Sequence, residues 1–335
     1  MGAYGLGELP GTSTVEAADI IQGETGDLLH LPQLPARGLG GDAIGRSIGL
    51  VDALTVERGA RSWMLSARPS RLTHLTRDYL SMDLDTCEEA WGTSLGHVKI
   101  QVVGPWTLGA QIELPNGHRV ITDRGAMRDL TEALILGIQE HVADVARRFR
   151  AEVSVQIDEP DLPVLVTGKL QGTSTFDTIR AVNVADINER LSGVFEAVRG
   201  GAVKNTYLNL TGGLPLWEVA KGAGADTVQV CLDQVKGNEQ LDGFGETITN
   251  GIRLGLGITG SEDHVDELLE KPRERAVQVA RFFDHLGVSR DYLVGHVDVH
   301  PRAGLGDVET VTAAANAYRM ARVVASMLEK DSGDL

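Results

Sequence analysis

Two adjacent carboxylates, Asp158 and Glu159, end an apolar run in the stretch VSVQIDEPDLP, which covers residues 153–163. Neighbouring carboxylates repel each other unless a cation lies close to them. The pair is therefore either a solvated turn, in which Pro160 sets the backbone, or one wall of a binding site. In a site, a carboxylate at this point would hold a substrate ammonium group or act as a base.

Histidine and cysteine supply further candidates for chemistry. His296, Asp298 and His300 alternate in the stretch HVDVH and would share one face of a strand. The two histidines would then lie about 13 Å apart, so at most Asp298 and His300 could share a metal ion. Cys231 ends the run TVQVCL and would need an electropositive neighbour to become a nucleophile. His300 and Cys231 are the candidate catalytic residues, and inert buried side chains are the alternative for both.

A glycine-rich stretch, GLGITG at 255–260, has the spacing of a nucleotide-binding loop. Such a loop follows the first strand of a βαβ unit, whereas this stretch lies late in the chain. Glycines that allow close packing of neighbouring groups are the favoured interpretation.

These residues must be positioned by strands and helices that alternate almost throughout the chain. Apolar stripes at helical spacing run through 130–149 and 308–324, and Pro272 suits the first turn of another helix. Eight apolar runs without strict alternation are typical of strands buried on both faces. The pattern predicts a single (β/α)8 TIM barrel of the α/β class over residues 1–330, with a polar tail at 331–335. The eight predicted strands are 3–8, 62–67, 98–104, 152–158, 206–210, 227–232, 253–259 and 292–299.

The carboxyl ends of barrel strands carry the chemistry of this fold, so they define a list of site positions. The segment 29–47 is rich in proline and glycine and is expected to be a long loop over the barrel mouth, with a helix beginning near Asp42. The strand ends are Glu8, Gly104–Trp106, Asp158–Glu159, Asn209–Thr211, Cys231, Thr259 and Asp298–His300.

Composition excludes several kinds of partner. The chain of 335 residues carries 47 acidic and 31 basic residues, a formal net charge of −16, which disfavours nucleic acid and anionic membranes as partners. Its two cysteines form no CxxC motif and no disulfide framework. No run is long and apolar enough for a membrane span, and no signal peptide is evident, so we expect a cytoplasmic protein.

Four motifs occur in an order that resembles the cobalamin-independent methionine synthase family: GELPGTS (7–13), VVGPWTLG (102–109), VQIDEPDLP (155–163) and RAGL (302–305). The resemblance is to the C-terminal catalytic barrel of that family and to its short actinobacterial-type homologues. The wider superfamily includes uroporphyrinogen decarboxylase and corrinoid methyltransferases. The resemblance implies methyl transfer from a folate donor to the thiol of homocysteine. In that family a zinc ion binds this thiol and activates it as a nucleophile.

The zinc ligands of that family are not retained here. The positions where the family carries His, Cys, an acidic residue and Cys fall near Asn209, Thr211, Cys231 and Ala303. These side chains cannot replace imidazole and thiolate ligands, so we expect no zinc and predict no other cofactor.

The amino-acid side of the pocket is more similar to the family. Its IDEP aspartate, which holds the homocysteine amino group, matches Asp158, and Glu8 replaces a small hydroxyl residue on the first strand. The expected substrate-binding residues are Glu8, Trp106, Asp158 and Glu159.

The sequence therefore predicts a diverged homologue with a small-molecule substrate, an amino acid or another thiol compound, and with the parent activity doubtful. Two alternatives stay open. One is a non-catalytic ligand-binding or regulatory barrel. The other is a metal-free enzyme of the same superfamily that catalyses another reaction. The sequence does not predict the oligomeric state or the methyl donor.

Overall fold

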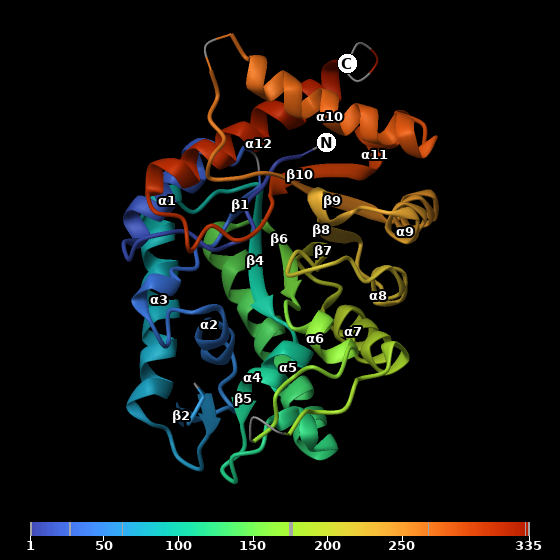
Figure 1. Ribbon diagram of the computed structural model, residues 1–335. Coiled ribbons are helices and arrows are strands. Elements are labelled where there is room, and N and C mark those ends of the chain that lie inside the picture. The colour runs from blue at the N-terminus through green and yellow to red at the C-terminus, as the bar shows by residue number, and fades with distance from the viewer. Residues whose placement is uncertain are drawn as a thin grey trace.

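The computed structural model describes residues 2–26, 28–61, 63–173, 177–266, 268–331 and 333. Its centre is a curled sheet of seven parallel strands in the order β1-β4-β6-β7-β8-β9-β10 (Figure 1). The strands are β1 (Leu29–His30), β4 (His97–Val103), β6 (Glu152–Asp158), β7 (Val203–Asn209), β8 (Thr227–Cys231), β9 (Arg253–Thr259) and β10 (Val297–Pro301).

The N-terminal segment occupies the eighth position and joins the two edges of this sheet. Ala3 forms a parallel bridge to Val299 of β10, and Glu8 forms one to Gln33, just after β1. Gly7 has a φ of +126°, which interrupts regular strand geometry between these two bridges. The predicted α/β barrel is thereby confirmed, with an irregular segment in place of the first strand.

Helices surround the sheet (Figure 1). The expected stripe at 130–149 lies in α5, Asp42 caps the amino end of α2, and Pro272 lies in the first turn of α10. None of the helices in the described ranges is long and apolar enough to cross a membrane. The helices are α1 (Thr14–Glu24), α2 (Ala43–Gly49), α3 (Arg71–Trp91), α4 (Pro105–Gln111), α5 (Arg124–Phe149), α6 (Leu162–Val166), α7 (Val184–Val198), α8 (Trp217–Gly222), α9 (Asn238–Thr249), α10 (Glu270–Leu286), α11 (Asp291–His296) and α12 (Val311–Asp331).

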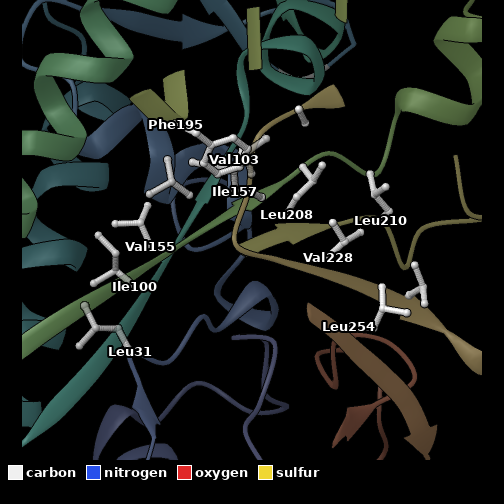
Figure 2. Close-up of a cluster of buried hydrophobic side chains, with 14 of the residues drawn as sticks. Leu31, Ile100, Val103, Val155, Ile157, Phe195, Leu208, Leu210, Val228 and Leu254 are labelled. Carbon is white, nitrogen blue, oxygen red and sulfur yellow. The ribbon is translucent and has the colours of Figure 1, made fainter. Parts of the chain in front are cut away.

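The two faces of the barrel strands differ in chemistry. Apolar side chains of β4, β6, β7, β8 and β9 belong to one buried cluster that includes Phe195 of α7 (Figure 2). Because side chains alternate along a strand, the residues between them face the barrel interior. That interior is polar, since Lys99, Gln156, Gln229 and His300 are all buried there.

One ion cluster fixes the helices beside the barrel mouth. Asp83 of α3 is 2% exposed and accepts hydrogen bonds from Thr14 at 2.6 Å and from Arg37 at 2.8 Å. Arg46 of α2 pairs with its second oxygen. This cluster holds α2, whose residue Ala43 lines the barrel mouth.

Three of the sequence-based assignments were wrong. Trp63–Leu65 form β3 in a separate three-stranded sheet with β2 (Val56–Arg58) and β5 (Ile112–Glu113), and Ser62 lies outside the described residues. Residues 29–30 are strand β1 rather than the start of a loop. Residues 292–296 belong to helix α11 and not to a strand. The prediction failed because a short apolar run does not distinguish helix from strand. His296 therefore ends a helix and does not share a strand face with Asp298 and His300.

Candidate functional site

The barrel mouth contains a cavity of about 210 Å³. It lies at the carboxyl ends of β4, β6 and β7, where Val103, Asp158 and Asn209 are in register. This agrees with the predicted register, in which Asp158 and Asn209 share one rim. The volume is below the roughly 300–1,000 Å³ of drug-sized pockets, so it suits a small ligand. The lining residues are Leu6, Glu8, Gln33, Ala43, Val103, Asp158, Pro160, Asn209, Thr211, Gly212, Ala303 and Gly304.

Asp158 is held by hydrogen bonds to only one of its two carboxylate oxygens. Oδ1 accepts from Gln156 Nε2 at 2.7 Å and from Asn209 Nδ2 at 2.8 Å. Within the described part of the chain, no hydrogen bond reaches Oδ2. Since Asp158 lines the cavity, its second oxygen is available to a donor on a ligand.

A buried hydrogen-bond network continues from Asp158 into the barrel interior. Gln156 uses its amide fully, because Nε2 also donates to the Leu6 carbonyl at 2.8 Å, while Oε1 accepts from Gln229 at 3.1 Å and from Lys99. This arrangement fixes the orientation of the amide and points its donor at Asp158.

Lys99 supplies the positive charge of this network. Its Nζ donates to the Gly5 carbonyl at 2.6 Å and lies 4.5 Å from the centre of the Tyr4 ring. Burial lowers the pKa of Lys99 to about 7 and raises the pKa of Asp158 to about 7. The charge of each group opposes the shift of the other, so the two ionisations depend on each other.

Glu8 forms another wall of the cavity. The side chain is half-buried, and its carboxylate packs against Gly304, where a Cβ atom would collide with it. Burial raises the pKa of Glu8, and the nearby Asp307 and Asp42 raise it further. No lysine, arginine or histidine lines the cavity among the described residues, so its charge is acidic.

Glu159 lies next to this cavity but does not line it. Its carboxylate accepts from the Trp106 amide at 3.0 Å, the Thr107 amide at 2.8 Å and the Thr107 hydroxyl at 2.7 Å. Burial raises its pKa to about 7, although these hydrogen bonds favour the ionised form. The side chain caps the amino end of α4, and Gly104 is required because any Cβ there would collide with the Glu159 carboxylate.

Trp106, Cys231 and His300 also lie outside the mouth cavity. Trp106 lines a second cavity between helices. Cys231 is 7% exposed, and burial raises its pKa, which disfavours the thiolate. His300 is fully buried, stacks on Tyr4 with ring centres 5.6 Å apart, and has its pKa lowered to about 4 by burial.

The four residues that the resemblance places at the family's zinc positions offer few metal-ligand atoms. Both ends of the Asn209 side-chain amide are engaged. Its Nδ2 donates to Asp158, and its Oδ1 accepts from the Thr211 backbone amide at 3.0 Å and from the Thr211 hydroxyl at 2.8 Å. Ala303 has no ligand atom in its side chain, and Cys231 is not in the cavity. Across the described ranges, no three His, Cys, Asp or Glu side chains are arranged to hold a metal. Asp298 instead pairs with Arg253 at 3.1 Å.

The glycines of the GLGITG stretch serve packing. A Cβ at Gly255 would lie 2.5 Å from the Tyr4 hydroxyl and 3.0 Å from the His300 ring. The absence of a side chain in this part of β9 leaves room for aromatic groups inside the barrel.

Lys99 and Gln156 were not among the residues predicted from the sequence. The signal was present, because polar residues alternate with apolar ones in VKIQV (98–102) and VSVQID (153–158). Such alternation predicts a polar face, which in a closed barrel is the interior.

Comparisons with known proteins support the fold. The sequence matches no protein-family profile and no curated protein. The structure is similar to a B12-independent methionine synthase from Shewanella sp. W3-18-1 in complex with selenomethionine, with a TM-score of 0.58 and 11% identity over 99% of both chains. It is also similar to a methyltransferase from Methanosarcina mazei, with a TM-score of 0.52 and 14% identity over 98% of this chain and 94% of the other. At these identities the likeness establishes the TIM-barrel fold.

Proposed function

We propose that the barrel mouth binds a small molecule through its primary ammonium group, and that amino acids are among its ligands. The observation that carries the proposal is the available Oδ2 of Asp158 in a small cavity with Glu8 as a second acidic wall. One oxygen of the Asp158 carboxylate already accepts hydrogen bonds, and the other can accept one from a ligand. A ligand ammonium group suits this position, because it has several N–H donors and a positive charge.

Two further facts support this ligand class. The cavity has no cationic side chain among its described lining residues, so a ligand that presents only anionic groups would meet repulsion from Glu8 and Asp158. The similar methionine synthase was solved with selenomethionine, which is an amino acid.

Methyl transfer is the reaction that the resemblance and both structural neighbours suggest. In this chain the family's zinc positions offer a single buried thiol, Cys231, outside the cavity, so a thiol substrate would not be activated in the way that the family requires. We therefore propose a diverged homologue that binds the amino-acid part of the substrate without zinc-dependent methyl transfer.

A thermal-shift panel tests the proposed ligand class. A ligand that binds only the folded state stabilises it in proportion to the logarithm of its concentration over Kd. Small primary amines and amino acids should raise the melting temperature at millimolar concentration, and matched alcohols, which have neither an amino group nor a carboxylate, should not. Stabilisation by both sets alike would contradict the proposal.

A turnover assay tests the second part. Homocysteine and methyl-folate should give no methionine, either with added zinc or without it. Methionine formation that depends on zinc and disappears in Cys231→Ser would restore the methyltransferase reading.

A further inference from the structure

A second cavity, of about 1,210 Å³, lies outside the barrel. It is lined by residues of α5, α7 and the segment 177–183 before α7, and by Trp106 of α4. The helices α5 and α7 lie side by side (Figure 1). The two cavities share no lining residue. This volume would hold a ligand larger than the mouth cavity can take.

Arg190 of α7 reaches across this cavity to α5. Its Nη1 donates to the Thr131 hydroxyl at 2.8 Å and to the Met127 carbonyl at 3.3 Å. The guanidinium lies 5.2 Å from the centre of the Trp106 ring. Its Nε is buried and has no acceptor among the described residues. The edge formed by Nε and Nη2, which pairs with carboxylates through two parallel hydrogen bonds, is thus unused.

Trp106 adds a second unused donor at the same end. The side chain is 6% exposed, and its indole N–H has no acceptor within the described part of the chain. Buried donors without an acceptor are rare in native proteins because they lose their hydrogen bonds to water. Two of them beside one cavity indicate that an acceptor belongs there, and a positively charged guanidinium favours an anionic one.

The remaining walls define the rest of the ligand. Apolar side chains of Ile121, Met127, Ile135 and Ile179 also line the cavity. An apolar group would bury surface against them, whereas a small inorganic anion would leave them exposed to water.

Charged residues surround the cavity. Arg124 and Arg180 are exposed and form no ion pair with a described carboxylate. Four acidic residues, Glu132, Asp177, Asp186 and Glu189, also line it, and all four are exposed. The acidic groups are exposed, whereas the two donors without an acceptor, Arg190 Nε and the Trp106 indole N–H, are buried, so a ligand anion would be held at the buried end.

From these contacts we infer that the cavity between α5 and α7 is a second binding site, for a carboxylate that carries an apolar body. The carboxylate pairs with the free edge of Arg190 and the Trp106 indole N–H, and the apolar body packs on the isoleucines and Met127.

The test uses 4-phenylbutanoate and its uncharged amide, 4-phenylbutanamide, as matched probes in calorimetric titrations of the full chain. The carboxylate should bind at one site, at least about tenfold more tightly than the amide, since charged hydrogen bonds have that magnitude. Arg190→Gln, which removes the charge and keeps a polar side chain, should remove this preference. Trp106→Phe, which keeps the ring and loses the N–H, should weaken carboxylate binding several-fold.

The control is Arg281→Gln on α10, which removes an exposed arginine far from the cavity in sequence and should leave binding unchanged. Arg190→Lys keeps the charge but loses the planar fork, so it should bind between the wild type and Arg190→Gln. Circular dichroism and melting temperature establish that each variant is folded. Absence of saturable carboxylate binding, equal affinity for the amide, or unchanged binding in folded Arg190→Gln would each overturn the assignment.

Discussion

Replacing Asp158 by asparagine removes one negative charge from the barrel mouth and keeps the shape of the side chain. The Oδ1 atom of asparagine can still accept the hydrogen bonds from Gln156 and Asn209, which now end on Oδ1 of Asp158. The amide nitrogen then takes the place of the available Oδ2. The change therefore turns an anionic acceptor into a neutral donor at the one atom where a ligand ammonium would bind.

The expected loss follows from the nature of this contact. A hydrogen bond to a charged group contributes about 2–3 kcal/mol, so Kd for a primary amine should rise roughly 30- to 160-fold. Glu8 would remain as an acidic wall, so we expect weakened rather than abolished binding. The fold should persist, because the substitution preserves the network to Gln156.

Isothermal titration calorimetry of a primary amine that stabilises the wild type measures this effect. Glu152→Gln is the matched control, because Glu152 lies at the other end of the same strand, is exposed and pairs with Lys204. It removes the same charge far from the mouth and should change Kd by less than about twofold. Equal affinity of Asp158→Asn and wild type for a confirmed amine ligand would refute the assigned role.

Three other predictions concern charge, stability and reactivity. Amine affinity should rise with pH through about 7, as the Asp158 carboxyl ionises. Lys99→Met removes the cation that favours this ionisation, so the midpoint of the affinity–pH curve should move to higher pH. An unmoved midpoint would exclude the coupling between Lys99 and Asp158. Asp83→Ala leaves the buried Arg37 and Arg46 without their carboxylate and should lower the free energy of unfolding, measured in urea, by about 3–5 kcal/mol. The exposed Asp85→Ala on the same helix should lower it by at most about 1 kcal/mol, and similar losses in the two variants would contradict the stabilising role of the Asp83 cluster. Cys87 and Cys231 are both buried, and burial raises the pKa of each thiol. Ellman's reagent should therefore titrate no thiol in the native protein and two after unfolding, and a fast reaction of the native protein would contradict the burial.

The barrel could be predicted from the sequence because most of its strands are long and buried. The runs at 98–104, 152–158 and 253–259 agree with β4, β6 and β9 to within a residue. The short elements were harder to predict. The strand β1 has only two residues, and Pro32 follows almost at once, so it carries little periodic signal. The run at 292–299 changes from helix to strand within a few residues, which no period can resolve.

The mouth could be predicted in part for a related reason. Strand ends identify positions along the chain, and so they placed Glu8, Asp158 and Asn209 at one cavity. They do not say which way a side chain turns after the strand ends. Glu159 turns to the amino end of α4, and Trp106 turns to the cavity between α5 and α7. Both directions depend on tertiary contacts that no local pattern encodes.

Ammonium recognition at the barrel mouth is the central claim, and one calorimetric comparison tests it most directly. Methionine, 3-(methylthio)propylamine and 4-(methylthio)butanoate share their apolar end and differ in the groups that the mouth would meet. At pH 7.5, and in the Arg190→Gln variant so that the cavity between α5 and α7 does not contribute, the two amine-bearing compounds should bind at one site. The butanoate should show no saturable heat there, because it brings only a negative charge to Glu8 and Asp158. Binding of the butanoate with an affinity equal to that of the propylamine would contradict the account.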